Sequence, residues 1–368
     1  MVHGVDFGTF GCKISTVNAS GKPEIVLNQR GEPFTPTAVY ISTEGDILYG
    51  TDAIEQGWLD PDGLIDDIKL HLGTLDNLAK RGKTITATDA AEMLLRHLKE
   101  VTEKKTGISV KDVVMTCPAN FKAPAKQALL EAAKRVGLNV LKLVPEPTAA
   151  SLAYYIHKAG DRTVAVYDFG GGTFDVSIVR FCKNQVDILA THGIAKCGGN
   201  DLTECIEKRV LEQVEWQCGS RPSQQDEPNF HFDLHQKAEA AKKSLNCRKE
   251  VPIVVALKTK QIVVKISQDQ FHQDIDPWIQ KTIDTLNRAI ASAGLTLQDI
   301  DHVLMVGGTS KLTYIEEKVA DTTGIVPKTD IDPDKAVVFG AAVACVIELA
   351  KDGQTPMSNG KVIPVPDV

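Results

Sequence analysis

Two stretches of the chain share one pattern, in which an acidic, glycine-containing turn separates two apolar runs. Residues 5–17 read V-D-F-G-T-F-G-C-K-I-S-T-V, and residues 163–181 read T-V-A-V-Y-D-F-G-G-G-T-F-D-V-S-I-V-R-F. Apolar runs that alternate or carry β-branched residues, on both sides of a short glycine cluster, predict a β-hairpin. Two hairpins of one kind, far apart in the chain, indicate two similar halves.

Apolar residues recur at helical spacing between and after these hairpins. A helix is expected to open at Asp89, where Glu92 stands in capping-box position, and to end before Gly107. Residues 233–246 carry an apolar stripe of Leu234, Ala238, Ala241 and Leu245. Further helices are predicted over residues 124–136 and 148–157, from Asp276 with Pro277 in the first turn, and after residues 307–310 and 332–334. Strands are predicted over residues 110–116, 140–144, 186–190, 251–266 and 303–306.

The mixture of strands and helices predicts an α/β fold. At 368 residues the chain can bury a sizeable core, which we expect to be divided between two lobes. Its hydrophobic content of 43% and charged content of 24% are ordinary for a globular protein. A net charge of −7 and an isoelectric point near 5.8 argue against a general nucleic-acid or acidic-membrane binder.

Targeting and cysteine patterns indicate a cytoplasmic protein. The chain has no run of 18 apolar residues, and its N-terminus reads directly into a predicted strand rather than a signal peptide. The eight cysteines include no C-x-x-C pair, so we interpret them as reduced thiols rather than disulfides or a zinc site. Cys12, beside the first hairpin turn, is interpreted as a small half-buried residue rather than a redox switch.

The turn of the second hairpin combines groups that suit different ions. Gly170, Gly171 and Gly172 allow backbone amides to approach an anion closely, whereas Asp168 and Asp175 would repel it. Two unit charges ~4 Å apart repel by about 4 kcal/mol at an effective dielectric of ~20, so a cation is needed between them. A polyphosphate with Mg²⁺ satisfies both demands, because this ion prefers oxygen ligands. The alternative is a structural hairpin with a polar tip.

The second copy of the pattern favours the ligand-binding interpretation. Asp6 matches Asp168, and both are followed by Phe-Gly. Neither turn is a Walker A loop, because no G-x-x-x-x-G-K-[S/T] occurs in the chain. Neither is a dinucleotide fingerprint, because a strand rather than a helix follows the glycines. The pattern therefore predicts two hairpin tips that point at one ligand.

Three stretches resemble one family, and a fourth, residues 143–150, joins the first two halves as in that family. The three are residues 5–11, 167–179 and 303–311 (V-L-M-V-G-G-T-S-K), and the fourth reads L-V-P-E-P-T-A-A. The chain resembles the nucleotide-binding domain of the seventy-kilodalton heat-shock (DnaK-type) chaperones, within the actin, hexokinase and heat-shock ATPase superfamily, from residue 3 to about residue 350.

The resemblance implies a two-lobed actin-like ATPase fold with ATP in the cleft. Each lobe would hold a ribonuclease H-like mixed five-stranded sheet flanked by helices. Lobe I would span residues 1–159, with a trimmed outer subdomain at about 40–90, and lobe II residues 160–328, with an outer subdomain at about 200–276. Residues 329–350 would return to lobe I as a helix, and residues 351–368 would form a linker-like tail.

The site residues are carried over from the family's motifs. The catalytic positions are Lys69, Glu146, Asp168, Thr173 and Asp175, and Mg²⁺ is held through water by Asp6, Asp168 and Glu146. The phosphate positions are Gly8, Thr9, Phe10, Gly11, Lys69, Gly170, Gly171, Gly172, Thr173, Gly198 and Gly199. The remaining nucleotide positions are Glu239, Lys242, Lys243, Asn246, Gly307, Gly308, Thr309, Lys311 and Asp334. The implied cofactors are ATP or ADP with Mg²⁺, and K⁺ is a further candidate.

Helical spacing alone puts Glu239, Lys242, Lys243 and Asn246 on one face, which without the resemblance could be a solvated face with an i,i+4 ion pair. Three features depart from the family. Phe10 stands where the family has a threonine, Lys243 stands where arginine is more usual, and the outer part of lobe I is short. Because lysine stacks on adenine less well than arginine does, we expect weaker adenine affinity. Because Phe10 removes one polar contact, we expect nucleotide binding to survive better than hydrolysis.

Several functional classes stay open. The first choice is a Mg²⁺-dependent ATPase whose lobes close on nucleotide and signal to a peptide-binding domain. The main alternative is a nucleotide-binding regulator that hydrolyses little or nothing; a small-molecule kinase and an actin-like filament protein are less favoured. The implied partners are a C-terminal peptide-binding domain, a J-domain cochaperone and a nucleotide exchange factor, with no nucleic acid or membrane, and the chain is expected to be a monomer.

Overall fold

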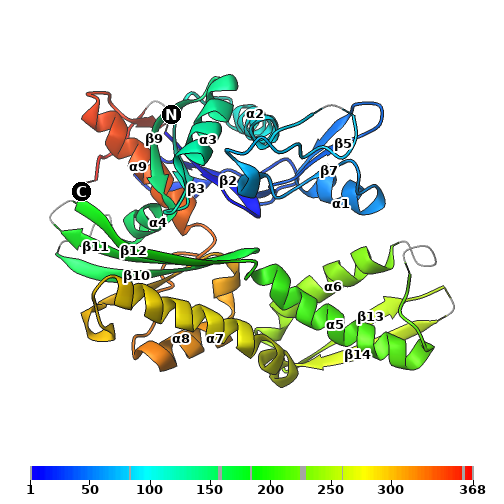
Figure 1. The fold of residues 1–368 in the computed structure, drawn as a ribbon. Coiled ribbons are helices and arrows are strands. Elements are labelled where there is room, and N and C mark those ends of the chain that lie inside the picture. The colour runs from blue at the N-terminus through cyan, green and yellow to red at the C-terminus, as the bar shows by residue number, and fades with distance from the viewer. Residues whose placement is uncertain are drawn as a thin grey trace.

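The computed structural model describes residues 2–82, 84–155, 160–182, 185–223, 229–258, 260–358 and 361–366. Two lobes lie one above the other in Figure 1. The upper one, lobe I, contains the N-terminal elements in blue and cyan together with the C-terminal helix in red. The lower one, lobe II, contains the bright green, yellow and orange elements, whereas the blue-green elements that precede them in the chain lie in lobe I. The predicted two-lobed α/β architecture is confirmed.

A mixed sheet forms the centre of lobe I. Its order is β3 (Pro23–Ile25), β2 (Gly11–Val17), β1 (His3–Phe7), β8 (Asp112–Cys117) and β9 (Asn139–Pro145), and β4 (Thr35–Pro36) also pairs with β2. β1 is antiparallel to β2 and parallel to β8. The first predicted hairpin is therefore confirmed, and it lies in the middle of the sheet.

Helices cover both faces of this sheet because successive strand residues point in opposite directions. Val113 and Met115 of β8 pack with α2 (Ala87–Thr106) and α3 (Ala123–Arg135). Val114, between them, packs on the other face with α4 (Glu146–Tyr155) and α9 (Ala336–Lys351). The helix predicted after residues 332–334 thus packs on the sheet of lobe I.

The outer part of lobe I is small. It consists of a three-stranded sheet of β6 (Ile47–Tyr49), β5 (Val39–Ile41) and β7 (Leu64–Ile65), the helix α1 (Thr51–Leu59) and a 3-10 turn, η1 (Ile68–His71). Lys69 lies in that 3-10 turn and is buried.

Lobe II is built on a second mixed sheet, ordered β12 (Gln185–Ala195), β11 (Thr173–Cys182), β10 (Arg162–Phe169) and β15 (His302–Val306). The second predicted hairpin, β10–β11, is confirmed. Five strands were expected, and the fifth is reduced to a single parallel bridge between Leu304 and Lys328. Both backbone groups of Lys328 face β15: its amide donates to the carbonyl of Val303 at 2.8 Å, and its carbonyl accepts from the amide of Met305 at 3.3 Å. α7 (Gln268–Ser292) and α8 (Thr313–Thr323) complete the lobe.

The outer part of lobe II lies at the far end of the β10–β12 sheet in Figure 1. It contains α5 (Gly199–Cys218), α6 (Phe230–Leu245) and the hairpin of β13 (Glu250–Ala256) and β14 (Gln261–Ser267). The predicted stripe of α6 is buried at all four positions, and it packs on the apolar face of β13–β14.

Two helix starts were predicted wrongly. α2 begins at Ala87 because Thr86 and Asp89 form the capping box, with the amide of Asp89 donating to the Thr86 hydroxyl at 3.3 Å; Asp89 therefore completes the box instead of opening it. α7 begins at Gln268 after a capping box of Ser267 and Gln270, so Pro277 lies inside the helix. The buried stripe runs across the proline, from Phe271 and Ile275 to Ile279 and beyond, and its burial offsets the proline's cost.

Two other local predictions also differ from the structure. Glu146 was expected in a stiff turn between Pro145 and Pro147, but it is the first residue of α4, where Pro147 is tolerated in the first turn. The tail expected as a linker contains a two-stranded hairpin of β16 (Met357–Ser358) and β17 (Lys361–Val362). Ile363, directly after it, is buried in the same apolar cluster as α4 and α9.

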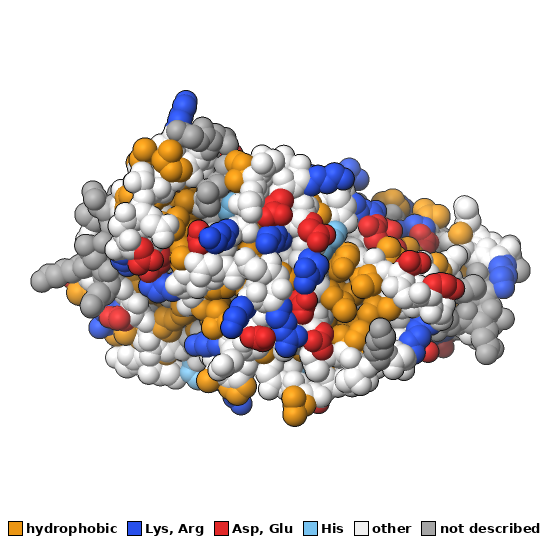
Figure 2. Space-filling view, turned by 90° about the horizontal axis from the view of Figure 1, so that it is seen from above, with side chains coloured by type: hydrophobic (Ala, Val, Ile, Leu, Met, Phe, Trp, Pro, Cys, Tyr) orange, Lys and Arg blue, Asp and Glu red, His pale blue; other side chains and the backbone are white. Residues whose placement is uncertain are grey.

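Among the described residues, no helix is long and apolar enough to cross a membrane. On the face of lobe I seen in Figure 2, Lys and Arg side chains alternate with Asp and Glu rather than forming a patch of one sign. This surface agrees with the near balance of charges in the composition.

Candidate functional site

A cavity of about 570 Å³ lies between the two lobes. Both hairpin turns open into it, together with the start of α5, one side of α6 and the turn after β15. All predicted site residues except Gly198 line this cavity: Asp6, Gly8, Thr9, Phe10, Gly11, Lys69, Glu146, Asp168, Gly170, Gly171, Gly172, Thr173, Asp175, Gly199, Glu239, Lys242, Lys243, Asn246, Gly307, Gly308, Thr309, Lys311 and Asp334.

The two hairpins place an aspartate at corresponding positions, one near the end of each first strand. Strand register sets Asp6 opposite Lys13, and it sets Asp168 opposite Asp175. The hydroxyl of Thr116 in β8 donates to the Asp6 carboxylate at 2.9 Å, which fixes that side chain at the floor of the cavity. The corner of lobe I therefore carries one acid and one base, whereas the corner of lobe II carries two acids.

Lys69 and Glu146 form a buried ion pair with 2.6 Å between Nζ and Oε1. Lys69 comes from η1 and Glu146 from the start of α4, so distant segments meet here. Burial alone would lower the pKa of Lys69, but the charges of Glu146 and Asp6 outweigh it and raise that pKa. Burial raises the pKa of Glu146, and the attraction of Lys69 opposes it. Lys69 is therefore held as a cation facing an excess of carboxylates.

The carboxylates of lobe II lie in an environment that disfavours their charge. Burial, and then the charges of Glu146, Asp175 and Asp6, raise the pKa of Asp168 well above its ordinary value. Burial, and then the charge of Glu146, raise the pKa of Asp175 to about 6. Four carboxylates thus converge, and of the residues that the structure describes Lys69 and Lys13 are the cations that balance them. A bound cation would relieve this excess of negative charge.

Hydrogen bonds accepted by its carbonyl groups fix the turn of the second hairpin. The amide of Gly199 and the Thr309 hydroxyl donate to the carbonyl of Gly170, at 3.0 and 2.7 Å. The amide of Asn200 donates to the carbonyl of Gly171 at 2.8 Å. Within the described part of the chain, the amides of Gly171 and Gly172 donate to no protein acceptor. The turn therefore presents backbone donors toward the cavity, which is the arrangement that binds anions.

Gly198 lies behind this turn rather than in the cavity wall. A Cβ atom at Gly198 would lie 2.4 Å from the carbonyl oxygen of Gly171 and from the amide nitrogen of Gly172. Only glycine allows this close approach of two backbones. Gly198 therefore supports the turn, whereas Gly199 lines the cavity at the start of α5.

The four polar residues of α6 do not behave as one solvated face. Lys242 is buried, and its Nζ contacts the carbonyl of Gly199 at 2.7 Å, the hydroxyl of Thr203 at 2.8 Å and Glu239 at 2.5 Å. Lys243 is 74% exposed and pairs with Glu239 at 3.2 Å. Burial lowers the pKa of Lys242, although the charge of Glu239 opposes this shift. Burial alone would raise the pKa of Glu239, but the charge of Lys242 outweighs burial and lowers the pKa of Glu239. Lys242 therefore ties α6 to α5, whereas Lys243 is the exposed cation of the two.

Asp334 joins the two lobes at the opposite wall. It accepts from Lys311 of lobe II at 2.8 Å and lies 4.0 Å from Lys13 of lobe I. Gly308 faces it so closely that a Cβ there would lie 2.8 Å from its Oδ1. Gly307 has φ +84°, a conformation that favours glycine.

The predicted set omitted several residues that line the cavity: Lys13, Phe34, Asn200, Val306, Leu312, Pro333 and Val337. Lys13 had a detectable signal, because the hairpin pairing places it opposite Asp6. Phe34 had none, since it reaches the cavity from a loop between β3 and β4. Cys12, by contrast, is fully buried against Thr37, and burial raises its pKa to about 12, which agrees with a structural thiol.

Within the described residues, no three His, Cys, Asp or Glu side chains converge closely enough to form a metal cage. The carboxylates of Asp6, Asp168 and Glu146 nevertheless share one cavity and one surplus of charge. This arrangement fits a hydrated Mg²⁺, which keeps several waters and needs few direct protein ligands.

A comparison with protein families gives a match over nearly the whole chain. The model of the family described as Hsp70 protein matches residues 2–365. This range contains both lobes and every residue that lines the cavity between them.

Proposed function

Because the chain belongs to the Hsp70 protein family, a family of nucleotide-binding chaperones that are generally ATPases, we propose that its cleft binds ATP or ADP with Mg²⁺ and hydrolyses ATP. The observation that carries this proposal is the cavity between two matching Asp-Phe-Gly corners, lined by free backbone donors on one side and by carboxylates on the other. These two kinds of group suit a polyphosphate and a cation respectively.

The carboxylates would receive the metal. Asp6 and Asp168, one from each lobe, and Glu146 would hold the waters of Mg²⁺. When bound, the ion would neutralise charge on the phosphates. The raised pKa of Asp168 supports this assignment, because it marks a place where negative charge lacks compensation in the free protein. K⁺ could add to the same compensation.

The phosphates would be held by both turns. On the side of lobe I the donors would come from residues 8–11, with the hydroxyl of Thr9. On the side of lobe II they would come from residues 170–173 and from Gly199 at the start of α5. Lys69, paired with Glu146, and Asp175 would position the attacking water. Phosphoryl transfer requires mainly placement and charge stabilisation, which such a set can supply.

The adenosine would lie against α6 and the turn after β15. Lys243, exposed and tied only to Glu239, can reorient toward a base, and Asn246, Gly308 and Asp334 lie along the same wall. Lys242 has a different role in this proposal. Since its three contacts fix the start of α5, it would support the phosphate turn rather than stack on adenine.

A second candidate is a nucleotide-binding regulator that hydrolyses little or nothing. Phe10 favours it, because the aromatic ring lies in the cavity at the phosphate turn and supplies no polar group. Single-turnover hydrolysis by the purified protein separates the two candidates. Release of phosphate from a stoichiometric complex with Mg²⁺ and ATP supports the ATPase; tight binding without release supports the regulator, and absence of binding refutes both.

Chaperone partners also belong to this proposal. A peptide-binding domain that follows the nucleotide-binding domain, a J-domain cochaperone and an exchange factor are the candidates implied by the family. In this proposal a J-domain would dock on the surface of lobe I at Lys142, which stands where the family usually has arginine. Lys142 pairs with Glu348 of α9 at 2.9 Å and is half exposed. Binding of a J-domain protein to the wild type and to a Lys142→Glu variant would test this contact.

A further inference from the structure

Phe10 reaches across the cleft from a backbone that is fixed. Its carbonyl accepts from the amide of Thr37 at 3.0 Å, and the Thr37 hydroxyl donates to the carbonyl of Gly8 at 2.7 Å. The turn of the first hairpin is therefore tied to the segment before β5. The residue is 46% exposed, so its ring has room to move while the backbone stays tied.

The ring of Phe10 rests on the glycine turn of the other lobe. A Cβ atom built on Gly171 would lie 2.7 Å from Cγ of Phe10, 2.9 Å from Cδ2 and 3.1 Å from Cδ1. The bare Cα of Gly171 thus contacts the ring, and a side chain at this position would collide with it. Gly171 is also one of two glycines in this turn, with Gly172, whose amides donate to no acceptor in the described part of the chain.

A second ring flanks Phe10 within lobe I. The centroids of Phe34 and Phe10 lie 6.2 Å apart, within the usual range for aromatic pairs. Phe34 packs so closely on Gly11 that a Cβ there would lie 2.6 Å from its Cδ2. Both rings therefore lie beside the first hairpin turn.

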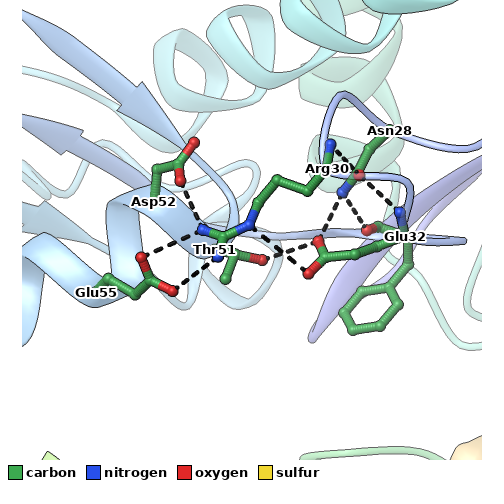
Figure 3. A network of polar contacts seen from close by, with 7 residues as sticks. Asn28, Arg30, Glu32, Thr51, Asp52 and Glu55 are labelled. Atoms are coloured by element: carbon green, nitrogen blue, oxygen red, sulfur yellow. Dashed lines mark hydrogen bonds and ion pairs between the residues drawn. The ribbon is translucent and has the colours of Figure 1, made fainter.

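Phe34 is positioned by the polar network shown in Figure 3. The side-chain amide of Asn28 donates to the carbonyl of Phe34 at 2.8 Å, and its oxygen accepts from the amides of Arg30 and Glu32 at 2.9 Å each. Arg30 in turn pairs with Asp52 and Glu55 of α1, at 2.7 and 3.1 Å. The loop that carries Phe34 is thereby fastened to α1.

We propose that Phe10 determines which nucleotide the cleft accepts, favouring a nucleoside diphosphate over a triphosphate. This inference rests on the proposed function, in which the phosphate chain runs from α6 toward Lys69 and passes between the two glycine turns. The ring lies between these turns, and the face of a phenyl ring carries negative charge density that repels an anion. The third phosphate of a triphosphate therefore has to displace the ring from Gly171, whereas a diphosphate does not require this displacement.

The test compares affinities for Mg·ADP and Mg·ATP by displacement of a fluorescent ADP, in the wild type and in Phe10→Ala and Phe10→Thr variants. The wild type should prefer ADP by about tenfold or more. Both substitutions should bring the ratio close to one, mainly by tightening the binding of ATP. Trp216→Ala, which removes an exposed aromatic residue of α5 outside the cavity, is the matched control and should keep the wild-type ratio.

Three outcomes contradict the inference, and they are distinguishable. Equal affinities of the wild type for the two nucleotides would show that the ring excludes nothing. An ADP preference that persists in both Phe10 variants would assign the selectivity to other residues. Absence of binding for either nucleotide would refute the proposed function itself, and the inference with it. Thermal unfolding of each variant establishes that the compared proteins are folded.

Discussion

In the proposed ATPase, Lys69, which is paired with Glu146, helps to position the attacking water. Replacing Lys69 by alanine should leave nucleotide binding measurable, because both glycine turns remain, but it should abolish the release of phosphate. Loss of Lys69 also leaves Glu146 buried beside Asp6 without a partner, at a cost in stability of about 3 kcal/mol. Single-turnover hydrolysis and equilibrium binding of ADP measure the two effects separately.

A matched control for that substitution is Lys265→Ala. Lys265 also forms an ion pair, at 3.0 Å with Glu250, but it is exposed on the outer hairpin of lobe II. Exposed pairs contribute little, so this variant should resemble the wild type in both measurements. Unchanged turnover in Lys69→Ala would refute the role proposed for Lys69.

The raised pKa of Asp175 predicts how the rate of hydrolysis depends on pH. In the proposed mechanism Asp175 accepts a hydrogen bond from the attacking water, and the ionised carboxylate is a stronger acceptor than the protonated group; its pKa is raised to about 6, chiefly by burial. The rate should therefore rise with pH, by about tenfold between pH 5 and pH 7, and level off above that range. Single-turnover rates across this range, with circular dichroism to establish that the fold persists, measure the profile.

The Asp175→Asn variant supplies the control for this profile. It should hydrolyse slowly and without the acidic limb, because the titrating group has been removed. A wild-type rate that is constant from pH 5 to pH 7 would contradict the proposed role of Asp175.

At the residue scale, sequence reasoning found the groups that local patterns mark. The Asp-Phe-Gly repeats identified both corners, and the hairpin pairing could have added Lys13, which lies opposite Asp6. It did not find Phe34, because the ring enters the cavity through a loop whose position depends on Asn28 and on contacts to α1. It also grouped Lys242 with Lys243 on one nucleotide-binding face, since helical spacing does not show that the ammonium of Lys242 reaches α5.

At the scale of elements, α7 shows which feature sets a helix start. Ser267 accepts from the amide of Gln270 at 3.2 Å, and the helix runs through Pro277, which is exposed. Ser267→Ala should lower the free energy of unfolding by about 1 kcal/mol, the usual cost of a lost N-cap. Pro277→Ala should raise it by about 1 kcal/mol, because alanine restores an amide inside the helix. Urea unfolding of both variants measures these changes.

The two substitutions discriminate between the possible helix starts. If the helix began at Asp276, as the sequence pattern predicted, Pro277 would lie in its first turn and its removal would bring no gain. A destabilised Pro277→Ala together with a neutral Ser267→Ala would contradict the observed start.

Elements were predictable where their pattern is local, and their ends were less so. The stripe of α6 and both glycine-turn hairpins followed from spacing alone. The start of α7 did not, because proline is a strong local signal that the buried stripe from Phe271 to Ile290 overrides. The reduced fifth strand of lobe II was also beyond local reasoning. Pairing at that edge depends on how far the residues after α8 run beside β15.

At the scale of the whole molecule, the lobes also meet at the outer end of the cleft. Trp58 of α1 in lobe I lies 5.7 Å from the ring of Phe232 and 5.8 Å from that of His235, both on α6 of lobe II, measured between centroids. His235 is held in turn by Glu207 of α5 at 2.6 Å. Nothing in the sequence around these residues indicates that they meet, since the contact exists only when both lobes are placed.

This contact should control how fast nucleotide leaves, because α1 and α6 must separate before a ligand deep in the cleft can escape. Two aromatic pairs are together worth about 2 kcal/mol, which corresponds to roughly a thirtyfold change in rate if the opening step breaks both. Trp58→Ala should therefore release fluorescent ADP at least about tenfold faster than the wild type in stopped-flow experiments, while the association rate changes little.

Trp216→Ala, which removes an indole remote from the contact, should leave both rates unchanged. If Trp58→Ala and the wild type released ADP equally fast, opening would have to be limited at the inner end of the cleft, where Phe10 rests on Gly171. In that case the Phe10→Ala variant would release ADP faster than the Trp58→Ala variant.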